Sequence, residues 1–256
     1  MITLLASAKT MRKALPPYGL ATTTPRFIAE ARDMAAAMAG QPVETLAQAF
    51  HCSTTIAGKT HREYLEFFTG DTAPALLAYY GQAYKCLHAD ALSLADWQYA
   101  QQHVFMVSFL YGLLRPLDAI HAYRMEGNVR PWADRDDMPF NYWKDRLTSL
   151  LIDAVNRDGG ILMHLATKEF ERLFHWQRVT QQLRVVQPLF YVDEGTRFRT
   201  VSMYAKSCRG AMTRYIVENK VDDPALLADF TFDGFRFDPH LGDDDHPHYI
   251  LQQNAK

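Results

Sequence analysis

Cysteine is scarce in this 256-residue sequence, and its placement excludes two kinds of protein. Cys52, Cys86 and Cys208 are an odd number, lie far apart and form no C-x-x-C pair. A disulfide framework needs paired cysteines, and a zinc knuckle needs closely spaced ones. The sparse cysteines instead fit a reducing compartment, so we expect a cytoplasmic protein.

Long hydrophobic runs are also missing. No stretch approaches the 18 apolar residues that a membrane-spanning helix requires. The opening MITLLASAKT contains too short an apolar run for a signal peptide and lacks a positively charged start. We therefore expect no membrane partner.

The common catalytic fingerprints are absent as well. The sequence contains no G-x-x-x-x-G-K-[ST], no G-x-G-x-x-G, no H-E-x-x-H and no G-x-S-x-G. Each of these patterns holds a phosphate, a metal or a nucleophile in a defined geometry. Their absence argues against nucleotide hydrolases, dehydrogenases and serine hydrolases.

The composition that remains is that of an ordinary globular protein, with 48% hydrophobic and 22% charged residues. The formal net charge of −2 argues against a general polyanion binder, but the charge is unevenly placed. Residues 222–256 hold eight Asp and only Arg236 and Lys256 as cations. The body of the chain is therefore mildly basic and its end is acidic.

Hydrophobic spacing predicts one compact α/β (α+β) domain, residues 1–238, in which helices wrap a central mixed β-sheet, followed by an acidic His/Asp-rich tail, 239–256. Apolar runs and turn residues predict strands at 2–6, 161–166 and in 183–202, and a hairpin at 230–238. Helical spacing predicts helices at 43–50, 54–68, 141–157 and 204–220, with a short one after Asp223.

Three further elements rest on capping and breaker signals. Thr24 before a proline indicates a helix start, and Gly40 indicates its end. Residues 74–84 have a strand-like apolar core. Ser93 and Asp96 form a variant capping box that opens a long helical pattern reaching residue 112.

The segment YAKSCRGAMTRYIVENK, residues 204–220, predicts a helix with one basic and one apolar side. A solvated basic face is one interpretation. An anion-binding face is the other, because only Glu218 is available to compensate the cations. Gly210 falls on the basic side, where a missing side chain would let a phosphate approach the backbone. The cations are Lys206, Arg209, Arg214 and Lys220.

A short polar loop follows the first predicted strand. It places Ser7, Lys9 and Thr10 at the carboxyl end of that strand, where ligands often bind in α/β sheets. The alternative is a loop that merely solubilises the strand end.

Residues 109–132 interleave arginines with aromatic residues. This composition suits phosphate contact combined with base stacking. Alternatively, the aromatic rings fill the core while the arginines pair with Asp118 and Glu126. The residues are Tyr111, Arg115, Tyr123, Arg124, Arg130 and Trp132.

Two other features allow a reactive and an inert interpretation. Cys208 lies between Lys206 and Arg209, which favours a thiolate, but its spacing places it on the apolar side of the helix. The segment HLGDDDHPH, residues 240–248, has a composition that could hold a divalent or ferric ion, although such segments are usually solvated. We assign no metal ligand.

Several longer motifs resemble, in order and spacing, the peroxide stress protein YaaA family. The resemblance runs from Leu4 to about Asp238. Its most specific parts are LYGLLRPLD with the following YR.E, and YAK..RG.M.RYI.EN. The other parts are SAKT, AQQHVFMVSF, FNYWKD, MHLATKEF and LADFTFDGFRFD.

The resemblance implies a compact domain with a central mixed sheet, a helix-hairpin-helix-like element and a basic cleft that can hold DNA. It also implies a role in protection from hydrogen peroxide through limitation of free iron. The positions that match the family motifs are Lys9, Thr10, Tyr111, Gly112, Arg115, Asp118, Tyr123, Arg124, Glu126, Lys206, Arg209, Gly210 and Arg214.

The chain departs from the family pattern at several of these motifs. The losses of charge and of a glycine are expected to weaken duplex binding, whereas a deep pocket for one small anion or nucleobase would tolerate them. Ala6 and Ser7 replace Ser and Pro, Tyr80 replaces a lysine or its neighbour, Gln82 replaces an acid, Phe109 replaces a glycine and Ser207 replaces a cation.

Two functions follow as hypotheses. The first is a stress protein whose basic cleft binds DNA or a nucleotide-like anion, through Ser7, Lys9, Thr10, Arg115, Arg124, Lys206, Arg209, Gly210 and Arg214. The second is an enzyme acting on a small nucleobase or nucleotide. Its anion holders or base would be Lys9 and Lys206, its acid/base Glu126 or Asp118, and its stacking or proton-donating group Tyr111. Iron handling by the acidic tail is a third, weaker hypothesis. The sequence leaves the cofactor and the oligomeric state open.

Overall fold

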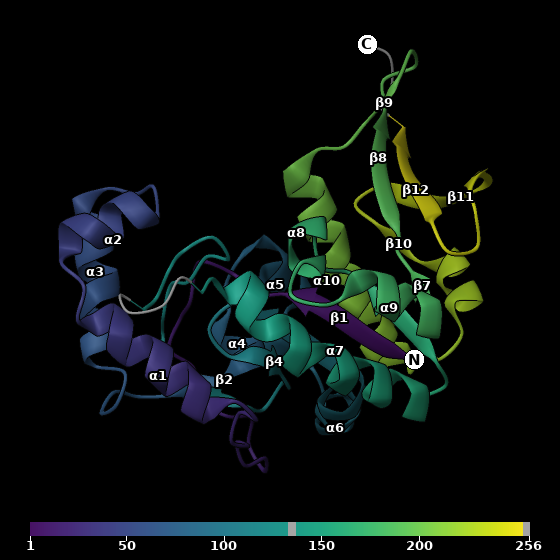
Figure 1. Ribbon diagram of the computed structural model, residues 1–256. Coiled ribbons are helices and arrows are strands. Elements are labelled where there is room, and N and C mark those ends of the chain that lie inside the picture. Colours follow the sequence, from purple (N-terminus) through teal and green to yellow (C-terminus); the bar gives the residue numbers. More distant parts are fainter. Residues whose placement is uncertain (133–136, 253–256) are drawn as a thin grey trace.

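The computed structural model describes residues 1–132 and 137–252, and it confirms an α/β fold with mixed sheets (Figure 1). The first sheet has the order β4-β3-β1-β6-β7. Its strands are β1 (Ile2–Ala6), β3 (Val104–Ser108), β4 (Gly112–Leu114), β6 (Ile161–His164) and β7 (Arg184–Val186). A separate two-stranded sheet pairs β2 (Ala73–Pro74) with β5 (Ala119–Ile120).

Strand β1 lies at the centre of the first sheet because nearly all of its side chains are apolar. It pairs in parallel with β3 on one side and with β6 on the other. Its residues Ile2, Leu4 and Leu5 are at most 2% exposed, so both faces of the strand are covered. Strand β7 continues the parallel pairing beyond β6, and β4 is antiparallel to β3.

The order of these strands creates a switch point at β1. The chain passes from β1 to β3 on one side and later reaches β6 on the other side. Where the loops after two neighbouring parallel strands lead to opposite sides, a crevice forms between these loops. It lies at the carboxyl ends of the strands. The loops after β1, β3 and β6 therefore meet at one edge of the sheet.

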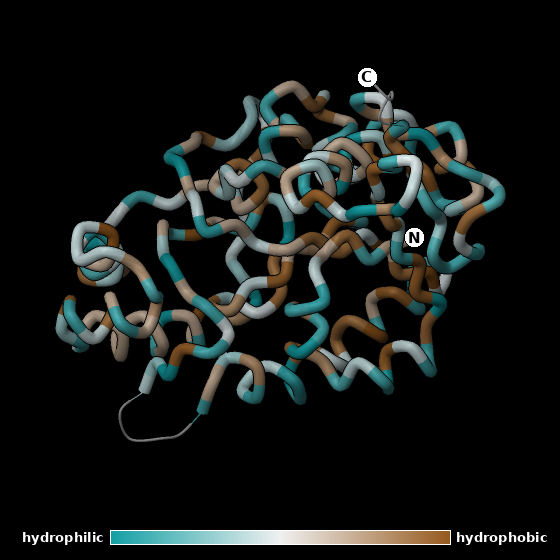
Figure 2. Tube along the Cα trace, turned by 90° about the horizontal axis from the view of Figure 1, so that it is seen from above, coloured by the Kyte–Doolittle hydropathy of each residue, from teal (hydrophilic) through white to brown (hydrophobic). Residues whose placement is uncertain are grey.

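Helices cover the first sheet. Helix α7 (Pro139–Arg157) runs along the sheet in Figure 1 and packs on β4, β6 and α9 (Trp176–Gln182). Helix α10 (Ser202–Asn219) packs closely on α5 (Gln82–Leu87) and also contacts α6 (Leu94–His103). In Figure 2, short hydrophobic stretches alternate with hydrophilic ones along the chain, as expected for elements that bury one face.

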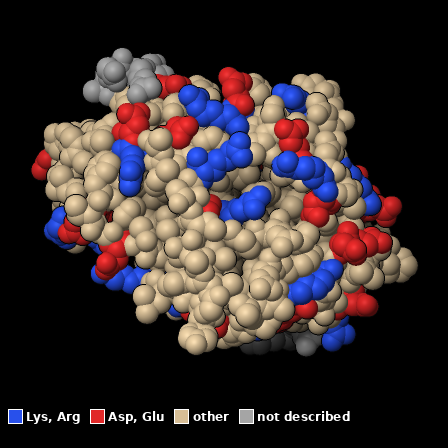
Figure 3. Space-filling model, turned by 90° about the horizontal axis from the view of Figure 1, so that it is seen from below, with Lys and Arg blue, Asp and Glu red and all other residues tan. Residues whose placement is uncertain are grey.

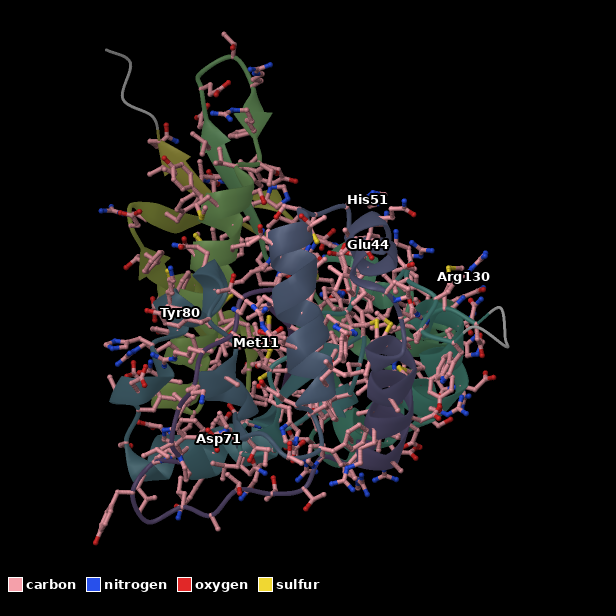
Figure 4. The ribbon with its side chains drawn as sticks, turned by 90° about the vertical axis from the view of Figure 1, so that its left-hand side faces the viewer. Met11, Glu44, His51, Asp71, Tyr80 and Arg130 are labelled. Atoms are coloured by element: carbon pink, nitrogen blue, oxygen red, sulfur yellow. The ribbon has the colours of Figure 1, made fainter. Side chains whose placement is uncertain are left out.

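Three helices form a separate lobe, on the left in Figure 1: α1 (Ile28–Ala39), α2 (Val43–Ala49) and α3 (Thr54–Leu65). The predictions at 43–50 and 54–68 are confirmed, and the Ser53 hydroxyl caps α3 by accepting from Ile56 N–H. Figure 4 shows this lobe with Glu44 and His51 toward its outer end, Met11 near the middle of the view, and Tyr80 and Asp71 beside the lobe. The helix-hairpin-helix-like element that the resemblance implies stays a prediction.

The second sheet has the order β10-β11-β12-β8-β9 and lies at the upper right of Figure 1. The predicted hairpin at 230–238 is confirmed by the antiparallel pairing of β10 with β11. The short 3-10 helix η2 (Pro224–Asp229) precedes this hairpin. The strands are β8 (Leu189–Asp193), β9 (Phe198–Arg199), β10 (Thr231–Phe232), β11 (Phe235–Gly242) and β12 (Pro247–Gln252).

Most of the segment expected as an acidic tail lies inside this sheet. Strand β12 pairs with β11 on one side and in parallel with β8 on the other. Tyr249 is 0% exposed and donates a hydrogen bond to the Leu227 carbonyl oxygen at 2.9 Å. The acidic residues lie in the turn at 243–245. Because of their composition the whole segment was expected to be a tail, and the buried strand that follows was not predicted.

Because β12 is central, we expect Tyr249→Ala to lower the free energy of unfolding by about 3–5 kcal/mol, as for other large-to-small core changes. Asp244→Ala, in the exposed turn of the same hairpin, is the matched control and should change it by less than about 0.5 kcal/mol. Urea unfolding followed by circular dichroism measures both. Equal stability of the two variants would show that β12 contributes nothing to the fold.

Three predicted elements differ from the structure. Helix α1 begins at Ile28 rather than after Thr24, although Gly40 ends it as predicted. Residues 74–84 form the short helices α4 (Ala75–Ala78) and α5 instead of a strand. The capping box of Ser93 and Asp96 is confirmed, but α6 ends at His103, because the apolar run at 104–108 forms β3. A buried strand and a buried helix cannot be told apart from the periodicity of so short a run.

Within the described part of the chain, no helix is long and apolar enough to cross a membrane.

Candidate functional site

A cavity of about 440 Å³ opens at the edge of the first sheet where the three loops meet. The loop after β1 supplies residues 7–10 and the residue after β3 supplies Phe109. The segment after β6 supplies Leu165 and Thr167, and helix α8 (Lys168–Glu171) supplies Glu169 and Phe170. Helices α5 and α10 and residues 123–126 close the remaining sides. The switch point of the sheet thus becomes a pocket, which we call the β1 pocket.

One wall of the β1 pocket holds an ionic cluster. The Glu126 carboxylate accepts a hydrogen bond from Lys9 Nζ at 2.8 Å and another from Arg124 at 2.8 Å. Lys9 comes from the loop after β1, so the cluster joins segments that are 117 residues apart. The buried Nε of Arg124 has no hydrogen-bond partner among the described residues. One donor of the cluster is therefore left without an acceptor.

The opposite wall carries two more cations, both from the first half of α10. Lys206 and Arg209 line the pocket, and neither has an ion pair or a side-chain hydrogen bond within the described residues. Burial lowers the pKa of the Arg209 guanidinium. An arginine nevertheless stays charged in a protein. Arg209 is thus a half-buried positive charge without an ion-pair partner among the described residues.

The floor of the pocket is apolar and aromatic. Phe109 stacks on Phe170 with ring centroids 4.6 Å apart and an interplanar angle of 16°. Phe109 is the residue that replaces a glycine of the family pattern, and it is 5% exposed. Its ring takes part in the pocket lining, where a glycine would have no side chain.

Two predicted residues, Ser7 and Thr10, also line the β1 pocket. The backbone carbonyl of Thr10 accepts a hydrogen bond from Tyr80 N–H, which fixes the end of the loop. Of the predicted set, the structure brings together Ser7, Lys9, Thr10, Arg124, Glu126, Lys206 and Arg209.

Arg115 and Asp118 lie outside the pocket. The Arg115 side chain is exposed and lies over the Phe105 ring, 5.6 Å from its centroid. The Asp118 carboxylate is buried and accepts from the Arg115 backbone N–H and from the Thr23 hydroxyl. Burial raises the pKa of Asp118, but its hydrogen bonds hold a turn rather than a ligand.

Tyr111 and Arg214 also do not reach the pocket. Tyr111 is 0% exposed, stacks on Phe67 and accepts a hydrogen bond from the His121 backbone N–H. Arg214 pairs with Glu218 at 2.7 Å and donates to the carbonyl oxygen of His88 at the end of α5. Tyr111 is a core residue and Arg214 fastens α10 to α5.

Gly210 serves packing and not phosphate contact. A Cβ atom at this position would lie 1.8 Å from the carbonyl oxygen of Ala83 in α5. The prediction that Gly210 lies on an open basic side of the helix is wrong, because α5 packs directly against this residue. The glycine lets the two helices approach closely, which sets the position of Lys206 and Arg209 above the pocket.

Two departures from the family pattern contact each other. Gln82 on α5 donates a hydrogen bond from Nε2 to the Ser207 hydroxyl on α10 at 2.8 Å. Gln82 stands where the family pattern has an acid, and Ser207 where it has a cation. Where the resemblance leads us to expect an acid and a cation, the structure has a hydrogen-bonded neutral pair.

Cys208 is buried and unreactive in character. It is 0% exposed, and burial raises the pKa of its thiol to about 12. Because the thiolate is the reactive form, the interpretation of an inert core cysteine is supported.

The acidic turn shows no metal site. In the described ranges, no group of three or more His, Cys, Asp and Glu side chains is placed to hold a metal ion. Asp243 accepts hydrogen bonds from the Asp245 and His246 backbone N–H groups, and Asp245 pairs with Arg184 at 2.9 Å. These carboxylates stabilise the turn.

Several pocket residues were not predicted as site residues: Tyr123, Thr167, Glu169 and Phe170. The segment MHLATKEF follows a predicted buried strand, just as SAKT does. The rule that ligands bind at the carboxyl ends of parallel strands would have identified its last four residues. Tyr123 was noted in the arginine-aromatic segment and as a family motif position, but it was not predicted as a site residue.

A sequence model of the family described as "Peroxide stress protein YaaA" matches residues 1–241. The chain belongs to the YaaA family. A UPF0246 protein of Bacteroides thetaiotaomicron is 41% identical over 246 residues, covering 95% of this chain and 96% of the relative. A UPF0246 protein of Porphyromonas gingivalis is 37% identical over 257 residues, covering 98% of this chain and 100% of the relative.

The surface of this YaaA family member is mixed in charge. On the face shown in Figure 3, Lys and Arg side chains are interspersed with Asp and Glu side chains. Such a pattern agrees with the net charge of −2. The unpaired cations of the β1 pocket are therefore a local feature and not part of a uniformly basic molecule.

Proposed function

We propose that this YaaA family protein binds a nucleotide-like anion in the β1 pocket and acts in the response to peroxide stress. The proposal rests on one observation above all. Arg209 is a half-buried guanidinium that lines a pocket without a carboxylate partner in the described chain. An uncompensated charge in such a place costs stability, and a bound anion removes that cost.

The remaining walls fit a ligand that is anionic at one end and apolar elsewhere. Lys206 lines the pocket together with Arg209, and Lys9 and Arg124 are also in the lining, where both bind Glu126. Aromatic rings of Phe109 and Phe170 form the floor. Phosphate oxygens suit guanidinium and ammonium groups, and a base suits apolar and aromatic surroundings.

The size of the pocket favours a small ligand over a DNA duplex. A volume of about 440 Å³ lies in the range of small-molecule sites. Arg115 and Arg214, which a duplex-binding cleft was expected to use, lie outside the pocket. DNA is thus the weaker candidate, and its binding is an outcome that the experiment distinguishes.

Isothermal titration calorimetry with AMP, inorganic phosphate and adenine, together with fluorescence anisotropy on labelled duplex and single-stranded DNA, tests the proposal. We expect AMP to bind more tightly than phosphate or adenine alone. AMP carries no condensed counterions, so its binding should depend only weakly on salt, whereas DNA binding should weaken steeply as salt is added. The proposal would be overturned if duplex DNA bound with an affinity that falls steeply with salt and if AMP did not displace it. The protein would then have a DNA-binding surface.

A further inference from the structure

A buried chain of hydroxyl groups leads from the core to the β1 pocket. The Tyr123 hydroxyl lies 2.6 Å from the Ser108 hydroxyl and 2.7 Å from the Tyr79 hydroxyl. Ser108 and Tyr79 are at most 1% exposed, and Tyr123 is 5% exposed and lines the pocket. The direction of each hydrogen bond in this chain follows from counting donors and acceptors.

Ser108 can donate only to Tyr123. Its oxygen accepts hydrogen bonds from the backbone N–H groups of Leu110 at 3.1 Å and Tyr111 at 3.0 Å. A serine hydroxyl has two acceptor lone pairs and one proton. Both lone pairs are occupied, and the Tyr123 oxygen at 2.6 Å is the acceptor within hydrogen-bond distance, so the proton points at Tyr123.

Tyr79 also donates to Tyr123. Besides Tyr123, the Tyr79 hydroxyl has the Ser108 hydroxyl nearby, but both lone pairs of Ser108 are already occupied, so Ser108 cannot accept the Tyr79 proton. If Tyr123 donated to it, the Tyr79 proton would be buried without an acceptor, and an unsatisfied buried donor is unfavourable. The favoured arrangement therefore places two donated hydrogen bonds on the Tyr123 oxygen.

The proton of Tyr123 is then left for the pocket. Tyr84, another buried tyrosine of the same wall, donates its proton to the Ala6 carbonyl oxygen at 2.8 Å and has none to offer. On the pocket side, the Tyr123 hydroxyl forms a hydrogen bond with the hydroxyl of Ser7, which also lines the pocket. Burial raises the pKa of Tyr123, whereas its hydrogen bonds with Ser108, Tyr79 and Ser7 counteract the rise.

We infer that Tyr123 is the hydrogen-bond donor of the β1 pocket and selects ligands that carry an acceptor atom opposite it, such as a carbonyl oxygen, a ring nitrogen or a phosphate oxygen. The inference rests on the proposed function for the identity of the ligand. The direction of the hydroxyl chain does not depend on any ligand.

The direction can be measured in the free protein. Tyrosine labelled with ¹³C at Cζ shows two resonances in mixed H₂O and D₂O when its hydroxyl proton exchanges slowly. We expect doubled resonances for Tyr79 and Tyr84 and a single averaged one for Tyr123, with assignment by Tyr→Phe variants. A doubled Tyr123 resonance in the free protein would overturn the inference, because its proton would then be held inside the fold.

The role in binding is measured with AMP as the probe. Tyr123→Phe should weaken AMP binding roughly tenfold, the loss of one hydrogen bond, with Tyr111→Phe as the matched control of unchanged affinity. Circular dichroism of both variants checks the fold. AMP bound equally well by Tyr123→Phe overturns the inference but leaves the proposed function standing. If AMP fails to bind at all, the proposed function fails and the resonance pattern still decides the hydroxyl direction.

Discussion

The paired change Lys206→Ala and Arg209→Ala is expected to weaken AMP binding by roughly 100-fold or more, because hydrogen bonds to charged groups contribute about 1.5–3 kcal/mol each. The same variant should unfold at equal or higher urea concentration than the parent. Its two cations have no partners in the described chain, and removing a half-buried unpaired charge relieves an unfavourable desolvation. Calorimetry and urea unfolding measure the two effects.

Arg214→Gln on the same helix is the matched control. Arg214 is occupied by Glu218 and by the carbonyl oxygen of His88, so its loss should reduce stability and leave the affinity for AMP nearly intact. If the paired variant loses affinity for AMP but not stability, and Arg214→Gln loses stability but not affinity, then the first half of α10 binds the ligand and the second half stabilises the fold. An unchanged affinity in the paired variant would contradict the assignment of the anion site.

Gly210→Ala is expected to lower the free energy of unfolding by about 3 kcal/mol, at the upper end of the cost of overpacking. The added methyl group would meet the backbone of α5, with the Ala83 carbonyl oxygen at 1.8 Å, and backbone cannot rotate away as a side chain can. Helix α10 must then move, and it carries Lys206 and Arg209. We expect AMP affinity to fall together with stability, as measured by urea unfolding and calorimetry.

Gly58→Ala supplies the matched control, since Gly58 also lies inside a helix, α3. A Cβ atom there would meet only Val43, at 4.0 Å. Alanine favours the helix over glycine, so this variant should be more stable by up to about 1 kcal/mol. A comparable loss of stability in both variants would mean that helix propensity, and not the contact with α5, explains the effect at Gly210.

Much of the fold followed from local signals in the sequence. The capping box at Ser93, the glycine at the end of α1 and the apolar run of β1 are each set by neighbouring residues, and all were predicted correctly. The strand at 104–108 was not, because its environment comes from pairing with β1, about 100 residues away. A short apolar run carries no information about such a partner.

The candidate site divides in the same way. Charge and motif spacing identified Lys9, Arg124, Lys206 and Arg209 as a group, and the structure places all four around one pocket. The helical wheel could not tell that α5 covers one side of α10, and this is why Gly210 and Arg214 were expected to face a ligand. Tyr111 and Tyr123 lie twelve residues apart with similar surroundings in sequence, and only tertiary packing decides which of them reaches the pocket.

The contact between Gln82 and Ser207 also bears on how divergence in this family is counted. Read along the chain, the two positions are separate losses, one of an acid and one of a cation. In the structure a 2.8 Å hydrogen bond joins the two side chains, so a change at either position also removes a partner of the other. A charged side chain introduced at only one of the two positions would face a neutral group between α5 and α10. We therefore expect the two positions to change together.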